Sequence, residues 1–382
     1  MHFTLKTVYH LDTDLKTLSY VHKRSETSCN KRKMPKLKRI LWLFLLIMSL
    51  IGAANASSAD VTPTMVIMDT ALDTSIPEIR ENLVYEVCIL DWNSCPNGRD
   101  YMEGPGASTM PKSLINLNGF SHGTQMTSAA LKTYPKLRFI FIRIIANSSS
   151  GARLSTSEGL VARALDWVLV NKDRFNIVSV GLAQSHHRLW NSRQYCPVSL
   201  KNNDVIRKLY YSGVPLFVAS GNDNDKERVS WPACIPESMA VSAITNQSIS
   251  RYSNFDRELS DFAAVGEMRV QTVGGGLTNA SGTSIATQVM AALWTQVRVE
   301  FPTFTFQETF DFLVGISKSV QVGTSTVKWV SSDAVNLAIF RYSMASRGLT
   351  SIQIAELERC AVLQKWYSGF IKFHLPEWWC AK

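Results

Sequence analysis

The sequence contains no Cys-x-x-Cys motif and no cluster of cysteine and histidine residues, so nothing in it predicts a zinc site. It also contains no internal repeat and no low-complexity tract, which excludes a repeat architecture. Hydrophobic residues make up 46% and charged residues 19% of the 382 residues, a balance typical of a globular rather than a disordered protein. A chain of this length can hold one large domain of about 250–300 residues plus extensions.

Excess positive charge is scarce once the first 56 residues are set aside. The whole chain carries a formal net charge of +9, but residues 1–56 hold ten Lys and Arg against three Asp and Glu. The remaining 326 residues hold 30 basic and 28 acidic groups, a surplus of only two. A protein that binds a polyanion carries its basic residues on the folded part. The sequence therefore predicts no nucleic-acid partner.

The amino-terminal region lacks an apolar run long enough for a comfortable membrane span, which needs about 20 residues. Its apolar run, Ile40 to Ile51, follows basic residues at positions 36, 38 and 39 and precedes small residues at 54–56. This pattern predicts a signal peptide over residues 34–56, beginning at Met34. Residues 1–33 are then interpreted as an over-extension of the gene model or as a cytoplasmic tail. In the alternative, the segment is an uncleaved anchor, and only then is contact with a membrane expected.

The sequence has few cysteines, and their number is even once residues 1–56, the predicted leader, are left out. Seven are present, and six remain once Cys29 is removed with the leader. An even count in an exported chain favours disulfides, although six cysteines allow 15 pairings. Proximity in the sequence suggests the pairs Cys88–Cys95, Cys196–Cys234 and Cys360–Cys380.

Strand and helix signatures alternate along residues 57–345, which we predict to be one domain. Residues 64–68 form a short β-prone run that ends at Asp69, and residues 157–170 carry apolar residues three and four positions apart. Residues 86–118, rich in Gly, Pro, Asn and Ser, are predicted to form a long surface loop. The alternation predicts an α/β fold with a mostly parallel central sheet and helices on both faces. Further strands are predicted at 137–145, 176–180, 215–219 and 239–244, and further helices at 121–131, 205–211 and 284–301.

Residues 346–382 are predicted to form a C-terminal extension of different character. A helix is expected over residues 352–366, followed by the aromatic-rich segment 376–380. We interpret the extension as a tail that packs against the domain. A surface for a partner is the alternative, because exposed aromatic patches tend to mark interfaces.

Four polar residues stand at the ends of predicted strands or the starts of predicted helices. Asp69 ends a strand, His122 begins a helix, Asn222 follows the strand 215–219, and Ser284 begins another helix. Active sites of open α/β sheets lie at the carboxyl ends of the strands. A carboxylate, an imidazole, an amide and a hydroxyl are the groups needed when a histidine-activated serine attacks an acyl carbon. Of the four histidines after the leader, only His122 begins a helix beside Gly and Thr.

The segments around these residues resemble the subtilisin-like serine proteases, the subtilases or peptidase S8 family. The order Asp, His, Ser is that of subtilisin, and Gly282-Thr283-Ser284-Ile285-Ala286 resembles the family's Gly-Thr-Ser-Met-Ala motif. The resemblance implies the subtilisin-like three-layer fold. It also implies roles for the four residues: Ser284 as nucleophile, His122 as general base, Asp69 as the group that orients His122, and Asn222 as an oxyanion-hole donor.

The resemblance further implies a cleft for a peptide or protein substrate. Residues 176–181 resemble the family's strand that pairs with an extended peptide, a mode of binding known as β-augmentation. Residues 219–221 are then expected on the opposite wall of the specificity pocket, with Ser230 near its floor. The residues expected to bind substrate are Ser179, Val180, Gly181, Ala219, Ser220, Gly221 and Ser230.

Some features depart from the family pattern. Gln288 stands where the family usually has Pro, and no pro-segment is evident between residue 56 and the first predicted strand. No cofactor is expected, and although calcium sites are common in the family, no ligand set can be placed. We predict a secreted serine endopeptidase. The alternative is a catalytically silent protein that binds a peptide or protein, and a serine esterase is disfavoured because Gly-x-Ser-x-Gly is absent.

Overall fold

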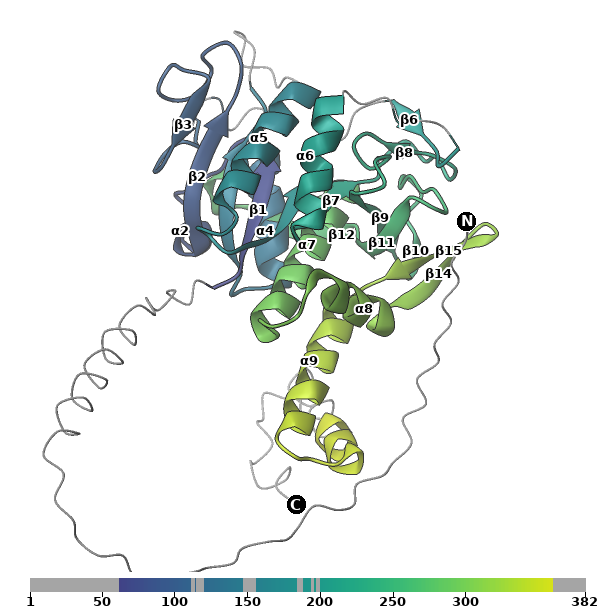
Figure 1. Cartoon of the computed structure of the whole chain (residues 1–382). Helices are drawn as coiled ribbons and strands as arrows, with labels where there is room; N and C mark the ends of the chain where they lie inside the picture. The colour runs from purple at the N-terminus through teal and green to yellow at the C-terminus, as the bar shows by residue number, and fades with distance from the viewer. Residues whose placement is uncertain are drawn as a thin grey trace, which may run out of the picture. The chain divides into compact units, whose positions relative to one another are not determined.

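The structure is a computed structural model, and it describes residues 62–110, 114, 120–146, 156–183, 188–193, 196 and 200–359. Within this part of the chain, parallel strands form the centre of an eleven-stranded sheet (Figure 1). In spatial order these strands are β2 (Leu83–Ile89), β4 (Arg138–Arg143), β1 (Thr64–Asp69), β5 (Ile177–Leu182), β7 (Leu216–Ala219), β9 (Met239–Thr245) and β11 (Ser260–Val265). The predicted fold class, a mostly parallel α/β sheet, is confirmed.

Shorter strands extend this sheet at its edges. β15 (Ser325–Trp329) lies parallel to β11, and β14 (Lys318–Val322) pairs antiparallel with β15. β3 (Tyr101–Glu103) pairs antiparallel with β2, and β10 (Ser248–Ile249) with β9. Two small ribbons lie outside the sheet: β12 (Glu267–Gln271) with β13 (Leu277–Ser281), and β6 (Leu189–Trp190) with β8 (Val229–Ser230).

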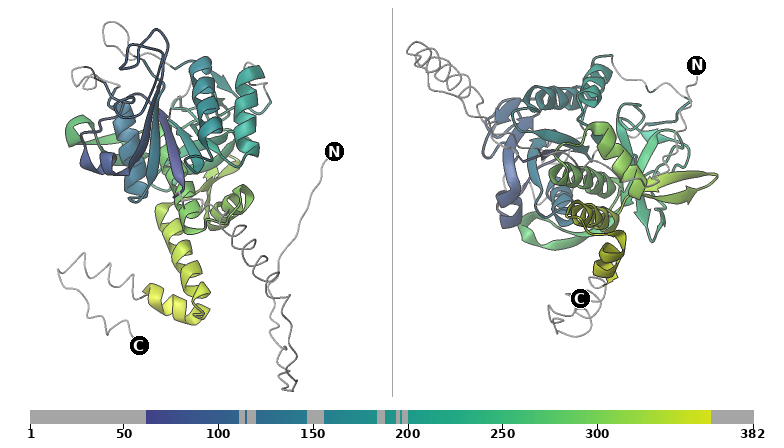
Figure 2. Two further views of the ribbon diagram at one scale, coloured as in Figure 1. Left: turned by 60° about the vertical axis from the view of Figure 1, so that its left-hand side comes forward. Right: turned by 60° about the horizontal axis from the view of Figure 1, so that its bottom comes forward.

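Helices cover both faces of the sheet, which gives three layers. α5 (Glu158–Asn171) and α6 (Leu200–Tyr211) lie side by side on one face, and α4 (His122–Thr133) and α7 (Thr283–Glu300) lie on the other (Figures 1 and 2). Met65 and Ile67 of β1 pack with α4 and α7, whereas Val66 and Met68 pack with α5 and α6. Side chains alternate along a strand, so a strand covered on both faces must be apolar at every position.

The remaining helices lie at the periphery. They are α2 (Pro77–Asn82), the short turn η2 (Val273–Gly275), α8 (Phe306–Ile316) and α9 (Ser332–Ser346). α9 extends away from the sheet, and its Arg341 forms an ion pair with Glu358 in the helical residues 351–359 (Figure 1). The rest of the helix predicted over 352–366 lies outside the described residues. In the described ranges, no helix is both long enough and apolar enough to cross a bilayer.

The predicted loop over residues 86–118 is wrong at its start. Residues 86–89 belong to β2, which pairs in parallel with β4, and β3 also falls within the range. The strand was missed because Glu86 is an acidic residue, which is usually exposed. Here its carboxylate is buried and accepts hydrogen bonds from the backbone of Gly106 and from Ser108. The sequence alone cannot distinguish a buried carboxylate that accepts hydrogen bonds from a loop from one that is exposed to water.

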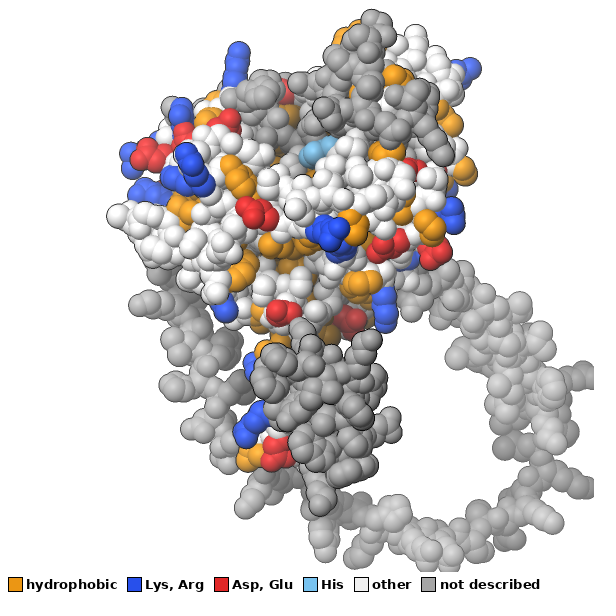
Figure 3. Space-filling model, turned by 180° about the vertical axis from the view of Figure 1, so that it is seen from behind, with side chains coloured by type: hydrophobic (Ala, Val, Ile, Leu, Met, Phe, Trp, Pro, Cys, Tyr) orange, Lys and Arg blue, Asp and Glu red, His pale blue; other side chains and the backbone are white. Residues whose placement is uncertain are grey.

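Two of the three suggested disulfides are confirmed. Cys88–Cys95 closes the loop after β2, and Cys196–Cys234 joins two segments 38 residues apart. Cys360 and Cys380 lie outside the described residues, as does the predicted signal peptide. On the face seen in Figure 3, Lys and Arg side chains are interspersed with Asp and Glu and form no patch of one sign.

Candidate active site

Asp69 and His122 form a hydrogen-bonded pair between β1 and α4. Asp69 is the last residue of β1 and is fully buried, whereas the side chain of His122, the first residue of α4, is 21% exposed. The Nδ1 atom of His122 lies 2.8 Å from Oδ1 and 2.9 Å from Oδ2 of Asp69. A carboxylate only accepts hydrogen bonds, so Nδ1 carries the proton in this pair. In the neutral ring, Nε2 is then the basic nitrogen, available to accept a proton.

Thr70 fixes the start of α4 against the end of β1. Its hydroxyl donates to the carbonyl of Phe120 at 3.0 Å and accepts from the backbone nitrogen of Gly123 at 2.9 Å. A Cβ atom at Gly123 would lie 2.5 Å from the carbonyl oxygen of Ala71. Only glycine therefore lets the helix approach the strand closely enough for the contact between His122 and the carboxylate.

Ser284 lies in the first turn of α7, where its side chain is half-buried. Its hydroxyl donates to the carbonyl oxygen of Ala183, the residue directly after β5, at 2.9 Å. A hydroxyl has a single proton, so transfer of that proton to His122 requires rotation away from Ala183. The position at the start of a long helix suits a developing negative charge, because backbone N–H groups there have no partner within the helix.

The side-chain nitrogen of Asn222 and the backbone nitrogen of Ser284 border the same small volume. The Oδ1 atom of Asn222 accepts from the backbone nitrogen of Thr283 at 2.9 Å and from its hydroxyl at 3.0 Å, which leaves Nδ2 directed elsewhere. A Cβ atom at Gly282 would lie 3.5 Å from this Nδ2 and 3.7 Å from the Ser284 nitrogen. Both nitrogens lie within 3.7 Å of this one point next to Ser284, as the two donors of an oxyanion hole would.

Asn254 organises the loop that carries Asn222. It is fully buried, and its Oδ1 accepts from the backbone nitrogens of Asp223 at 2.8 Å and Asp225 at 3.1 Å. Its Nδ2 donates to the carboxylate of Asp223 at 2.9 Å, and its backbone nitrogen donates to the carbonyl of Gly221 at 2.9 Å. The loop is thereby held on both sides of Asn222.

The predicted pairing of a peptide with residues 176–181 needs correction. β5 lies inside the sheet, and residues 180–182 pair with β1 on one edge and with β7 on the other. Because both rows of backbone hydrogen-bonding groups are in use there, an extended peptide cannot add along them. Any pairing with a peptide has to involve the chain beyond β5, where Ala183 follows.

The substrate-binding residues predicted from the sequence fall into two groups. Ser179 and Val180 face the helical layers: the Ser179 hydroxyl contacts α7, and Val180 packs in the cluster under α5 and α6. Residues 219–221, by contrast, lie together with Ser230, whose backbone nitrogen donates to the carbonyl of Ser220 at 2.8 Å. A Cβ atom at Gly221 would lie 2.2 Å from the Ser230 hydroxyl, which is buried without a partner among the described residues.

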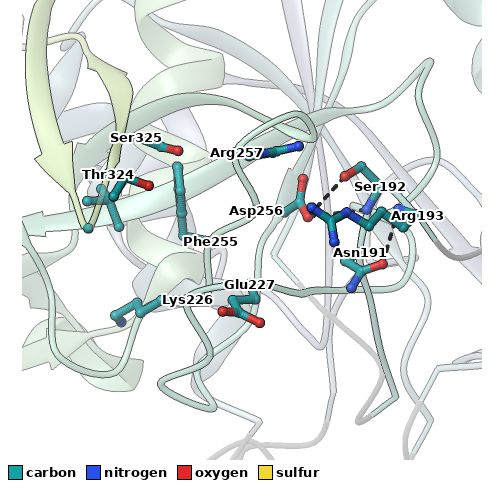
Figure 4. A pocket seen from close by; sticks show the side chains of 12 residues that line it. Asn191, Ser192, Arg193, Lys226, Glu227, Phe255, Asp256, Arg257, Thr324 and Ser325 are labelled. Carbon is teal, nitrogen blue, oxygen red and sulfur yellow. Dashed lines mark hydrogen bonds between the residues drawn. The ribbon is translucent and has the colours of Figure 1, made fainter.

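A separate cavity of ≈ 340 Å³ lies between the loops near β6 and the β14–β15 turn (Figure 4). Two of its charged groups are engaged by the protein itself: Asp256 accepts from the backbone of Ser192, and Lys226 donates to the carbonyls of Arg251 and Ser253. Burial lowers the pKa of Lys226. None of the four candidate catalytic residues lines this cavity, so it is distinct from the candidate active site. Its lining comprises Asn191, Ser192, Arg193, Lys226, Glu227, Phe255, Asp256, Arg257, Val322, Gly323, Thr324 and Ser325.

Several supporting residues were not identified from the sequence. Thr70 and Thr283 could have been found, because each is adjacent to a motif residue and carries a hydroxyl. Asn254 and Ala183 carry no local signal, since their partners lie far away in the chain. For metals, the described part of the chain contains no group of three His, Cys, Asp or Glu side chains that could hold an ion.

Comparisons with known proteins point to one family. A family model described as the subtilase family matches residues 62–327. The chain is 30% identical over 199 residues to a cuticle-degrading protease of Metarhizium anisopliae, which covers 50% of this chain and 48% of that protein. It is 28% identical over 181 residues to the alkaline serine protease ver112 of Corniculantispora psalliotae, covering 46% and 44%. The chain thus spans about half the length of the curated relatives it matches.

Solved structures show the same fold. A cold-adapted subtilisin-like serine proteinase superimposes with a TM-score of 0.53 at 20% identity, over 73% of this chain and 91% of that chain. The prenylagaramide maturation protease PagA superimposes with a TM-score of 0.55 at 16% identity, over 73% and 94%. At these identities the likeness extends to the fold alone.

Proposed function

Because this chain belongs to the subtilase family, we propose that it is a serine endopeptidase that cleaves peptide bonds through an acyl-enzyme intermediate. The observation that carries the proposal is the contact of 2.8 Å between the buried carboxylate of Asp69 and Nδ1 of His122. This contact holds the imidazole in the tautomer that can accept a proton at Nε2.

In the proposed reaction, the hydroxyl of Ser284 leaves the carbonyl of Ala183 and passes its proton to His122 as its oxygen attacks the scissile carbonyl. Asp69 stabilises the imidazolium and stays ionised. The oxygen of the tetrahedral intermediate takes the position between Nδ2 of Asn222 and the backbone nitrogen of Ser284. His122 then returns the proton to the leaving amine, and water hydrolyses the acyl-enzyme by the same steps.

We further propose that the substrate is a peptide or protein segment in an extended conformation, bound beside Ala183, the residue that follows β5. The group of residues 219–221 with Ser230 would receive one of its side chains. No cofactor is proposed for the reaction, because every step uses groups of the chain itself.

Export of the protein is part of the proposal. The described disulfides Cys88–Cys95 and Cys196–Cys234 support an oxidising compartment, in which such bonds persist. The segment at residues 34–56 has the pattern of a signal peptide that directs a chain there.

The direct test is labelling with a fluorophosphonate, which reacts with an activated serine. Full-length protein, produced in an oxidising compartment, is compared with Ser284→Ala and with Ser281→Ala, an exposed serine three residues away that serves as the matched control. We expect labelling of the wild type and of Ser281→Ala and none of Ser284→Ala. In Asp69→Asn, labelling should slow by about 10³–10⁴-fold, because the wrong tautomer of His122 is favoured.

Unlabelled protein from the same preparation would then be assayed on a peptide library to identify its cleavage preference. A folded wild-type protein that is neither labelled nor cleaves any peptide would reject the proposal. That result would favour the alternative in which the fold binds a peptide or protein without cleaving it.

A further inference from the structure

A row of four polar contacts joins β5 and the residue after it to α7; we call it the β5–α7 seam. On the strand side, Ser179 uses its hydroxyl, whereas Gly181 and Ala183 use their backbone carbonyl oxygens. The helix side uses positions three or four residues apart, which share a face. Ser179 and the helix residues Gln288 and Thr295 are fully buried. The contacts are Ala183 O with Ser284 Oγ at 2.9 Å, Gly181 O with Gln288 Nε2 at 3.2 Å, and Ser179 Oγ with Thr295 Oγ1 at 2.7 Å and with Ala291 O at 3.3 Å.

Gln288 is poorly explained as a contribution to stability. Its Nε2 donates to the carbonyl of Gly181, but its Oε1 is buried and has no donor among the described residues. A buried acceptor without a donor is costly, and an apolar side chain of the same size would avoid that cost. The amide also occupies room that only glycine leaves free, because a Cβ atom at Gly181 would lie 2.4 Å from Oε1.

We propose that Gln288 is a positioning residue that keeps the end of β5 in register with the nucleophile; the inference rests on the proposed peptidase function. Gln288 lies one helical turn after Ser284, and Gly181 lies two residues before Ala183. The contact between Gln288 and Gly181 therefore limits how far the backbone at Ala183 can shift relative to Ser284.

This position matters most for a peptide substrate. A peptide bound beside Ala183 inherits any displacement of the backbone there, and a misplacement of about 1 Å can cost about 10²-fold in rate. A small reagent that contacts only the serine hydroxyl does not depend on the position of Ala183 relative to Ser284. Loss of the Gln288 contact is thus expected to separate peptide cleavage from labelling of Ser284.

The test compares Gln288→Met with Gln296→Met in the full-length protein. Gln296 lies on the same helix and is largely buried, but it donates to Asn336 of α9 at 2.7 Å, away from β5. For each protein, kcat and KM are measured on a tetrapeptide amide, the rate of fluorophosphonate labelling is measured separately, and thermal unfolding is followed. The wild type is included in every assay.

We expect kcat/KM of Gln288→Met to fall about 10- to 100-fold on the peptide while its labelling rate stays within about threefold of the wild type. Its melting temperature should be unchanged or higher, because the unpaired acceptor is removed. Gln296→Met should keep the wild-type ratio of peptide cleavage to labelling.

Three results would overturn the inference. The first is an unchanged kcat/KM in Gln288→Met, and the second is an equal loss of cleavage and labelling together with a lower melting temperature, which would indicate a merely structural role. The third is the same selective loss in Gln296→Met. A wild-type protein that fails in both assays would instead reject the proposed function, on which the inference depends.

Discussion

The amide oxygen of Asn222 accepts two hydrogen bonds from Thr283, one from its backbone nitrogen at 2.9 Å and one from its hydroxyl at 3.0 Å. Thr283 is also the first residue of α7 and directly precedes Ser284. The same residue therefore orients the side-chain donor and leads into the backbone donor of the candidate oxyanion hole. The rotamer of Asn222 is determined before any substrate binds, which is the preorganisation that such a site needs.

Replacing Asn222 with Ala should reduce kcat about 10²–10³-fold, or about 2.7–4 kcal/mol, and leave KM nearly unchanged; the magnitude is the one established for subtilisin. The physical reason is that Nδ2 donates a hydrogen bond to the substrate's carbonyl oxygen only when negative charge develops on that oxygen. Steady-state kinetics on a peptide amide would measure both parameters. A rise in KM with constant kcat would contradict the oxyanion role and indicate ground-state binding instead.

Replacing Asn254 with Ala should lower the free energy of unfolding by about 1–3 kcal/mol, because the backbone nitrogens of Asp223 and Asp225 lose their buried acceptor. The loop that carries Asn222 would loosen, so kcat should fall about tenfold as well. Urea unfolding and peptide kinetics test both effects. Asn279→Ala, at an exposed position of β13, is the control, and destabilisation without loss of kcat would contradict the link to Asn222.

Replacing Gly123 with Ala should abolish or nearly abolish labelling of Ser284. The added Cβ would lie 2.5 Å from the Ala71 carbonyl oxygen and 2.8 Å from the Phe141 ring, so α4 must shift and carry His122 away from Asp69. Gly159→Ala, near the start of α5, is the control: its nearest neighbour would be 3.8 Å away. The control should be neutral or more stable by about 0.4–1 kcal/mol. Equal labelling of both variants would contradict the packing argument.

The stability of the protein should fall as the pH rises from about 4 to about 7, in part through Asp261. Burial raises the pKa of this carboxyl from 3.8 to about 7, although it accepts a hydrogen bond from the backbone nitrogen of Ala240 at 2.9 Å. The folded state therefore holds the proton more tightly than the unfolded state, and the stability that this adds below about pH 4 is lost through about pH 7.

In Asp261→Asn the acceptor is kept and the titration removed. Relative to the parent, this variant should gain about 1–3 kcal/mol between about pH 4 and pH 8, after allowance for partial solvation. Urea unfolding in a Ser284→Ala background, which prevents self-cleavage, would measure the difference. A constant difference between the two proteins across this range would show that Asp261 ionises normally.

Much of the fold could be read from local pattern. The apolar residues at positions 65–68 occupy every site of a short strand, and the structure distributes them alternately between two helical layers. The α/β fold class, most of the central strands and the helices α4, α5, α6 and α7 follow from such patterns, because burial on one face or on both leaves a recognisable pattern of apolar residues. β2 escaped prediction because Glu86 interrupts that signature with a buried acid.

The sequence by itself determined which chemical groups lie at the carboxyl edge of the sheet. Asp69 ends a strand and His122 begins a helix. Because the carboxyl ends of parallel strands lie at one edge of the sheet, the contact between these two residues follows from their types and their places in the sequence. Only the tertiary structure decided which strand edges are occupied. β5 is paired on both sides, and the apolar pattern of a buried strand is the same whether or not a peptide can reach its edge. It also decided the partners of Asn254 and Gln288, because a hydrogen bond between residues 29 or more positions apart depends on how layers pack and leaves no mark in the surrounding sequence.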